Sequence, residues 1–305
     1  MRLLLLVLCV SALTLGCGTT AETPRETAGP RSALVPGPVI RGGFTGTAGF
    51  TTLRGPVAVA AAGQDLFIAD GGLGQIFRAE PFANRLTPLG VRVSAPGTRL
   101  AAELDGSLYL LDPVSRRIQR LARDGRTAQT FAADATVASL RDLALDPARG
   151  RLLAADALNR QLVAFRPLGV SFELLPVRGE PRHELQSLDA IAVAPGALYA
   201  IDARCACLAR LAFDGRVLAT FGHQRLSRPE HLAADRDGRI FVSDRGERAI
   251  KVFREDALEE TIPWARFGLT EITDLAYGEG WLYAADAPGA QVVMLRVQPL
   301  PKGTK

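Results

Sequence analysis

Apolar runs recur at regular intervals along this chain, and each run ends in an aspartate. The six aspartates are Asp70, Asp112, Asp156, Asp202, Asp244 and Asp286. Neighbouring members are 42 to 46 residues apart, and six residues after each stands another aliphatic side chain, as at Ile76 and Ile118. Helical repeats of this length would show apolar spacings of three to four, whereas several short strands per repeat are typical of propeller blades.

A single repeat contains the four strands that a blade needs. Alternating apolar residues follow an Asp-Gly turn within 213–222, and a proline-led segment covers 228–235. A second Asp-Gly turn leads into 239–244, and the strand at 249–253 completes the unit. Asp-Gly pairs supply the positive φ of tight hairpin turns. The sequence therefore predicts an all-β, six-bladed β-propeller of four-stranded antiparallel blades over 38–298.

This pattern resembles the NHL repeat, in which a proline-led inner strand precedes an apolar strand ending in Asp. The resemblance covers residues 38–298, although only the third repeat keeps the asparagine (Asn159) and only the second has arginine before isoleucine (Arg117-Ile118). In six-bladed propellers of similar architecture that act as lactonases or lyases, metal ligands or catalytic histidines come from the central channel. The resemblance thus implies that a site would lie there.

The two ends of the repeat region predict how the ring closes. The last repeat runs out at Val297 after three strands, so its outer strand is missing. The segment from Pro38 to Phe44, followed by 53–57, matches the outer-to-inner connection of the other repeats. We expect this N-terminal strand to pair in the last blade, which leaves no open sheet edge there.

The first residues read as an export signal. An apolar run from Leu3 to Leu15 is too short to span a bilayer and ends at Cys17 in a sequence that resembles a bacterial lipobox. We predict a signal peptide at 1–16, lipidation of Cys17, a flexible tether at 17–37 and a tail at 299–305. An ordinary cleaved signal is the alternative. Gly18 after the cysteine favours the periplasmic side of the outer membrane if the host is Gram-negative.

The formal charge of +4 is spread over the repeats and is almost all arginine. Because the arginines form no basic tail or stripe, this charge favours solubility and does not indicate a nucleic-acid-binding surface. We expect no nucleic-acid partner and a monomeric domain.

Polar residues at the start of the innermost strands are the candidate site. The position before the first aliphatic residue of these strands holds Pro56, Arg99, Asp142, Ala190, His231 and Asp274, with Asp189 and Glu230 adjacent. Convergent carboxylates and a histidine could bind a divalent cation such as Ca²⁺ or Zn²⁺, or perform acid-base chemistry. The alternative is that these polar groups hydrate the channel and neutralise one another.

The six repeated aspartates are predicted to be structural, since a residue that recurs once per blade most simply accepts hydrogen bonds from the backbone of the following loop. The loop residues after them vary from blade to blade. Variable loops on a rigid ring are where a binding surface would form. The candidates are Arg116, Arg117, Asn159, Arg160, Arg204, Arg245, Glu247 and Arg248.

Two of the four cysteines fall inside the repeats. Cys205 and Cys207 are separated by one residue. In an exported protein such a pair could be a disulfide, a redox couple or half of a metal site. The simpler interpretation is that Cys207 is an ordinary apolar residue before a strand and Cys205 a loop residue.

Two functions remain open at this stage. The first is a lipid-anchored cell-envelope propeller that binds an unidentified envelope protein or a small ligand. The second is a metal-dependent lyase or lactonase with its site at the channel mouth. No Ser-His-Asp order, phosphate-binding glycine loop or zinc-type spacing is present in the sequence.

Overall fold

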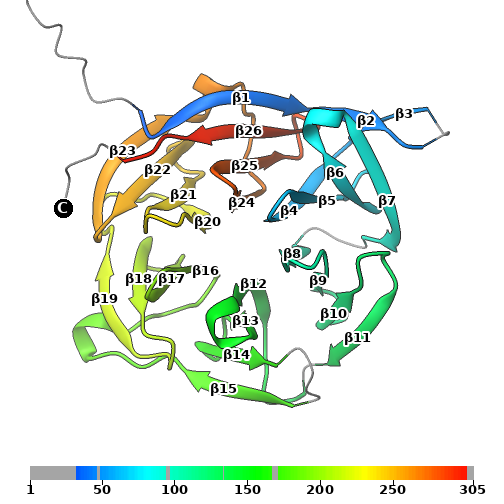
Figure 1. Cartoon of the computed structure of the whole chain (residues 1–305). Helices are drawn as coiled ribbons and strands as arrows, with labels where there is room; N and C mark the ends of the chain where they lie inside the picture. Colours follow the sequence, from blue (N-terminus) through cyan, green and yellow to red (C-terminus); the bar gives the residue numbers. More distant parts are fainter. Residues whose placement is uncertain (1–31, 47–48, 94–96, 133, 167–170, 301–305) are drawn as a thin grey trace, which may run out of the picture. The chain divides into compact units, whose positions relative to one another are not determined.

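The computed structural model describes residues 32–300, apart from 47–48, 94–96, 133 and 167–170. The predicted signal peptide, Cys17 and most of the tether and tail lie outside this part of the chain. Six antiparallel sheets surround a common axis, as blades do in a propeller (Figure 1). No helix within the described residues is long and apolar enough to cross a membrane.

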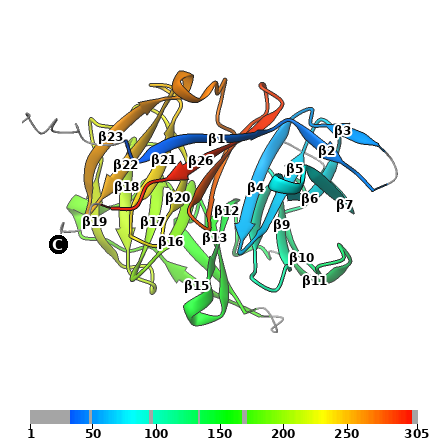
Figure 2. The same ribbon diagram turned by 45° about the horizontal axis from the view of Figure 1, so that its top comes forward.

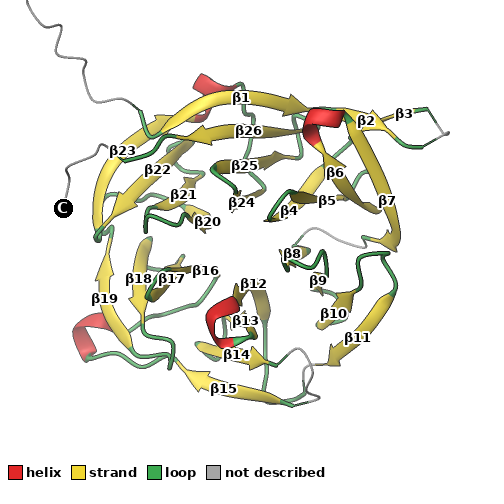
Figure 3. Ribbon diagram, in the orientation of Figure 1, coloured by secondary structure: helices red, strands yellow, loops and turns green. Residues whose placement is uncertain are grey.

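Blades 1 to 5 each contain four strands in chain order, and blade 6 takes its outer strand from the N-terminus. In every blade one strand lies at the axis and one at the rim (Figure 3). Blade 1 contains β4 (Pro56–Ala62), β5 (Asp65–Asp70), β6 (Gln75–Glu80) and β7 (Arg85–Arg92). Blade 2 contains β8 (Arg99–Ala102), β9 (Leu108–Asp112), β10 (Arg117–Leu121) and β11 (Thr127–Ala132). Blade 3 contains β12 (Leu140–Asp146), β13 (Arg151–Asp156), β14 (Gln161–Phe165) and β15 (Phe172–Pro176).

The second half of the ring repeats this order. Blade 4 contains β16 (Ala190–Ala194), β17 (Ala197–Asp202), β18 (Cys207–Leu211) and β19 (Val217–Phe221). Blade 5 contains β20 (Pro229–Ala234), β21 (Ile240–Asp244), β22 (Ala249–Arg254) and β23 (Ala257–Pro263). Blade 6 contains β24 (Asp274–Gly278), β25 (Trp281–Asp286) and β26 (Gln291–Val297). Short 3-10 turns are η1 (Pro81–Ala83), η2 (Pro147–Arg149), η3 (Pro181–His183) and η4 (Trp264–Phe267).

The N-terminal strand β1 (Leu34–Ile40) completes blade 6 by pairing antiparallel with β26, from Leu34 opposite Val297 to Ile40 opposite Val292. The expected closure of the ring is therefore confirmed. The chain then crosses to blade 1, where β2 (Gly42–Phe44) and β3 (Phe50–Thr52) form a hairpin that pairs with β7 (Figure 2). One continuous segment thus joins the outer edges of the last and first blades.

Two boundaries in this segment differ from the sequence prediction. The closing strand begins at Leu34, so residues 34–37 belong to the strand and not to the tether. Pro36 and Gly37 suggested a loop, but β1 is an edge strand whose register shifts between Pro36 and Val39, where such residues are tolerated. Residues 42–44, expected to continue the closing strand, instead form β2 in blade 1.

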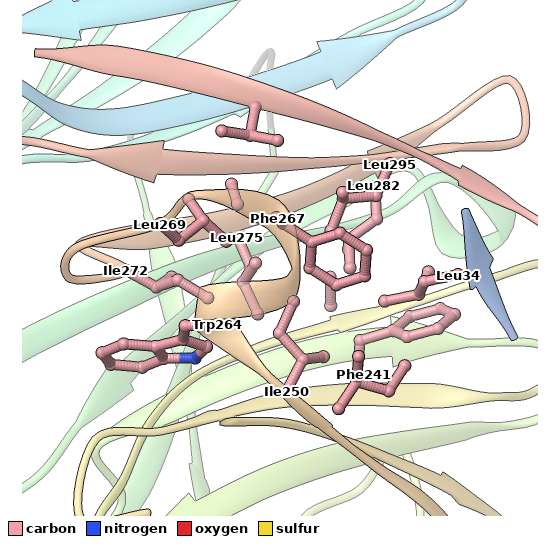
Figure 4. Close-up of a cluster of buried hydrophobic side chains, with 14 of the residues drawn as sticks. Leu34, Phe241, Ile250, Trp264, Phe267, Leu269, Ile272, Leu275, Leu282 and Leu295 are labelled. Atoms are coloured by element: carbon pink, nitrogen blue, oxygen red, sulfur yellow. The ribbon is translucent and has the colours of Figure 1, made fainter. Parts of the chain in front are cut away.

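The apolar core lies between the blades. The buried hydrophobic side chains form six clusters within the described residues, and each cluster joins two neighbouring blades. Figure 4 shows the cluster between blades 5 and 6, in which Leu34 of the closing strand packs with Phe241 and Leu295. A blade therefore buries its apolar faces only when both neighbours are present.

The tight packing of the closing strand β1 predicts that even one added methyl group lowers the stability of the ring. A Cβ atom on Gly37 would lie 2.5 Å from Cζ3 of Trp281 and 2.8 Å from the Met294 carbonyl oxygen. We expect Gly37→Ala to lower the free energy of unfolding by about 1–3 kcal/mol, as overpacking does in a core. Urea unfolding measures this. Val39→Ala, at an exposed position of the same strand, is the control. Equal stability of the two variants would contradict a tightly packed closing strand.

Candidate functional site

The innermost strands align one residue of each blade around the channel. In each blade this residue pairs with the residue that precedes the repeated aspartate. The six residues of this layer are Ala58, Arg99, Asp142, Ala190, His231 and Asp274. The sequence alignment placed Pro56 in blade 1, which is wrong by two residues. Val57-Ala58 and Val59-Ala60 both match the aliphatic-alanine pattern of the inner strands, and the structure aligns the second pair with Leu232-Ala233 of blade 5.

This axial layer contains the same order of residues twice, namely alanine, a basic residue and aspartate. Arg99 Nε lies 3.7 Å from Asp142 Oδ1, and His231 Nδ1 lies 3.6 Å from Asp274 Oδ1. The two pairs stand three blades apart, so the layer has an approximate twofold repeat.

Each axial carboxylate also satisfies a backbone amide of the next blade. Asp142 Oδ2 accepts a hydrogen bond from the amide of Ile191 (2.8 Å), and Asp274 Oδ2 accepts one from the amide of Val59 (2.9 Å). An innermost strand is a sheet edge, and its buried amides need partners. Both carboxylates therefore have a structural role at the channel.

Burial opposes ionisation of the carboxyls and the imidazole in the axial layer. Burial raises the pKa of Asp142 to about 6 against the effect of the Arg99 guanidinium. Burial raises the pKa of Asp274 to about 7, again opposed by Arg99 and supported by the charge of Asp142. Burial, with a smaller effect of Arg99, lowers the pKa of His231 well below its usual value, so this imidazole is neutral.

The channel between the six inner strands is narrow. Its cavity has a volume of about 190 Å³ and is lined by Asp142, His231 and Asp274 together with small and aliphatic residues. Pockets that enclose small-molecule ligands usually measure about 300–1,000 Å³. The axial layer can therefore hold water or a group of very few atoms.

The two adjacent acidic residues do not join the axial layer. Asp189 Oδ2 accepts hydrogen bonds from the amide of Ala203 (2.9 Å) and from the hydroxyl of Ser187. Glu230 pairs with Arg228 (2.9 Å) and Arg245 (3.6 Å) at the surface. The structure thus brings together Arg99, Asp142, His231 and Asp274 and directs the other two away.

Donor spacing decides which residues could hold a metal ion. Within the described part of the chain, one group of three Cys, His, Asp or Glu residues has its donor atoms within 4.8 Å of one another, and it consists of Cys205, Cys207 and His223. The axial carboxylates and His231 do not form such a group. His223 was missed in the sequence because it comes from a different connection of blade 4 than the cysteines.

The repeated aspartates fix two loops at once. Asp244, for example, accepts hydrogen bonds from the amides of Ser227 and Arg228 before its blade and from those of Gly246 and Glu247 after it. Five of the six are fully buried: Asp70, Asp156, Asp202, Asp244 and Asp286. Asp112 is partly exposed and accepts from Val114 and Ser115. The contacts to the preceding loop were not foreseen from the sequence.

One of these carboxylates shows the electrostatic consequence of the loop contacts. Burial by itself would raise the pKa of Asp156. Hydrogen bonds from the amide of Ala138, the side chain of Gln161 and the amide of Ser139 outweigh burial, so the pKa lies below its usual value.

The loop residues considered for a binding surface are all exposed except Arg245, which is half-buried. Five of them make side-chain contacts with other parts of the ring. Asn159 donates to the Thr136 carbonyl (2.9 Å), and Arg160 pairs with Glu184 (3.0 Å). Arg245 pairs with Glu271 (3.0 Å), Glu247 pairs with Lys251, and Arg248 donates to the Thr270 carbonyl (3.2 Å). Apart from Glu247, whose partner lies in the strand after its own turn, these residues link connections of the ring to one another.

A second and larger cavity opens at the other end of the channel. It has a volume of about 790 Å³ and is lined by the turns between the first and second strands of all six blades. We call this cavity the turn funnel. Its lining segments are 61–63, 102–104, 145–151, 193–196, 234–236 and 277–279, with Phe213. The sequence does not predict this cavity, because turns from six separate blades form it together.

Charges in the turn funnel are matched internally. The carboxylates that line it are each paired with arginine, in the pairs Glu103–Arg120, Asp146–Arg151, Asp235–Arg239 and Glu279–Arg236. The guanidinium of Arg149 lies 3.6 Å above the Phe213 ring. Leu104 projects with 79% of its surface exposed. What remains open to a ligand is mainly apolar.

Comparison with known proteins places the fold. No protein-family model and no curated protein matches this chain. A protein of unknown function from Bacteroides thetaiotaomicron has a TM-score of 0.62 at 14% identity, over 81% of this chain and 70% of that one. A streptogramin B lyase has a TM-score of 0.59 at 13% identity, over 80% and 94%.

A third solved structure widens the range of these neighbours. Hydrazine synthase of Kuenenia stuttgartiensis has a TM-score of 0.58 at 12% identity, over 84% of this chain and 99% of that one. At such identities the likeness concerns the propeller fold alone.

The raised pKa of Asp274 predicts a pH-dependent stability. An unfolded aspartate releases its proton near pH 4, whereas Asp274 in the folded chain does so at about 7. Between these values the folded state binds more protons, so the free energy of unfolding falls as the pH rises. Asp274→Asn should remove this loss and gain stability relative to the unchanged chain, by on the order of a few kcal/mol between pH 4 and pH 8.

Urea unfolding at several pH values tests this prediction. Asp214→Asn, at an exposed aspartate on an outer turn, is the control. It should change the free energy of unfolding by the same amount at low and at high pH. A difference between Asp274→Asn and the unchanged chain that does not vary with pH would show that folding does not raise the pKa of Asp274.

Proposed function

We propose that this propeller is a ligand-binding module that holds a small apolar molecule in the turn funnel. The internal pairing of all four funnel carboxylates carries the proposal, because it leaves no unmatched acidic group to attract a cation or to repel an apolar occupant. The volume of about 790 Å³ lies in the range usual for small-molecule pockets.

The shape of the turn funnel supports the same ligand class. Small residues such as Ala62, Ala148 and Gly196 line its wall and leave space, while Leu104 and Phe213 offer apolar surface. A site of this kind gains most of its binding free energy from burying apolar area, at about 25 cal/mol per Å². A few polar groups, such as the Arg149 guanidinium, would orient the ligand.

An acid-base lyase is the second candidate. The neutral imidazole of His231 beside Asp274, whose pKa is near neutrality, favours it, since opposed environments of two titratable groups are typical of catalytic pairs. Structural neighbours include a streptogramin B lyase and a virginiamycin B lyase from Staphylococcus aureus. We place this function second because the axial carboxylates already hold backbone amides and their cavity is small.

The proposal includes an NHL-type propeller anchored in the cell envelope by lipid. The supports are the repeated aspartates, the Asp-Gly turns and the lipobox-like sequence before Cys17. The chain should incorporate a labelled fatty acid and sediment with membranes when expressed in a bacterium. Cys17→Ser should abolish both. Fatty-acid labelling that persists in this variant would contradict the anchor at Cys17.

Blocking the turn funnel tests the binding function. Ala148 lies exposed on its wall in η2, and Ala148→Trp places an indole in the cavity. We expect the neutral apolar probe N-phenyl-1-naphthylamine to bind the unchanged chain, and its affinity to fall about tenfold or more in the variant, a loss of about 1.4 kcal/mol. Fluorescence titration measures both.

The control is Ala128→Trp, which adds the same indole to an exposed position of β11 at the rim. Probe affinity in this variant should match that of the unchanged chain. Absence of binding, or equal affinity in both variants, would contradict the turn funnel as the ligand site.

A further inference from the structure

The turn between the second and third strands has the same backbone form in every blade. One residue of each turn has a positive φ, between 49° and 66°: Gly74, Arg116, Arg160, Ala206, Arg248 and Ala290. The two residues that flank it are Leu73 and Gln75 in blade 1 and Asn159 and Gln161 in blade 3. In blade 4 they are Cys205 and Cys207. Five blades form this turn without cysteine, so the turn itself does not require the pair.

The rest of blade 4 holds the two cysteines in place. They form a disulfide with their Cα atoms 5.2 Å apart. The buried carboxylate of Asp202 accepts hydrogen bonds from the amides of Arg204 (2.9 Å) and Cys205 (3.3 Å). Cys207 is the first residue of β18 and pairs opposite Asp202. Because these contacts do not involve sulfur, the turn should keep its form when the disulfide is reduced.

A histidine from the connection between β19 and β20 lies close to the two cysteines. His223 follows β19, in a turn fixed by hydrogen bonds from the amides of Arg225 (3.0 Å) and Leu226 (3.2 Å) to the Gly222 carbonyl. An imidazole nitrogen and both sulfur atoms lie within 4.8 Å of one another. Cys207 is buried, Cys205 is partly exposed and His223 is exposed, so an ion could enter from solvent.

We propose that Cys205, Cys207 and His223 form a redox-gated binding site for a thiophilic metal ion such as Cu⁺ or Zn²⁺. Two thiolates and one imidazole are ligands that these ions prefer, and three protein donors leave a position open toward solvent. Disulfide sulfur is not a thiolate, so the oxidised form does not bind the ion. The site lies at the opposite end of the blades from the turn funnel and is independent of it.

Conversion of the oxidised chain to the reduced chain requires a reductant, and a dithiol can supply the electrons and protons. The dithiol transfers two electrons and two protons to the Cys205–Cys207 bond, which breaks to give two thiols, while the reductant forms its own disulfide. Binding of the ion then displaces the two thiol protons into solvent. Exchange with a disulfide as oxidant reverses the step: the two cysteines re-form their bond, the oxidant is reduced to two thiols, and the ion is released.

The test uses the untagged full-length chain in detergent, in a Cys9→Ser/Cys17→Ser background, so that Cys205 and Cys207 are its only cysteines. The reduced chain is titrated without oxygen with Cu⁺ and, separately, with Zn²⁺ against chromophoric chelators. We expect one equivalent of at least one ion to bind to the reduced chain and none to the oxidised chain. Comparison of the two titrations shows whether the site prefers Cu⁺ or Zn²⁺.

Variants locate the site. Cys205→Ser/Cys207→Ser should abolish binding, and His223→Ala should weaken it about tenfold or more, since even the loss of a group behind a ligand has an effect of this size. His183→Ala removes an imidazole that bonds to Thr220 and should leave affinity unchanged. Circular dichroism confirms that each variant is folded.

Three results would overturn the proposal. The reduced chain could bind neither ion, or the double cysteine variant could bind as well as its parent. Equal affinity in the His223→Ala and His183→Ala variants would remove His223 from the site.

Discussion

Every blade of this protein depends on its two neighbours, because the apolar side chains are buried between blades and not within them. The six clusters of the core each need residues from two sheets, including the cluster that joins blade 6 to blade 1 through Ile40. Burial at about 25 cal/mol per Å² is the main favourable term in folding. A blade alone would expose both faces, so the ring is stable only when it is closed.

Closure also explains the two different ends of the channel. Where the inner strands begin, the carboxylates of Asp142 and Asp274 accept hydrogen bonds from amides of the next blade. The cavity at this end is small. At the other end the strands turn back through the loops that line the larger cavity. The same packing that makes one end dense leaves the turn funnel open.

The sequence predicted the ring and its closure because the repeated aspartates mark the register of every blade. It misplaced Pro56, since two aliphatic-alanine pairs in β4 fit the same pattern. It began the closing strand at Pro38 because proline and glycine usually indicate loops. From the sequence, Arg99, Asp142, His231 and Asp274 were predicted to lie at the channel. The approach of His223 to the cysteines and the turn funnel could not be predicted, because both join segments from separate connections.

The pairing of β1 with β26 sets the order in which this domain can fold. Leu34 lies opposite Val297, so the last sheet unites residues from the two ends of the domain. Contacts of such sequence separation carry a large loop-closure entropy and slow the folding rate. During synthesis, blades 1 to 5 can form one after another as they leave the ribosome, but blade 6 must wait for its final strand. Until then β1 has no partner, and the unfinished ring is open to pairing with other chains.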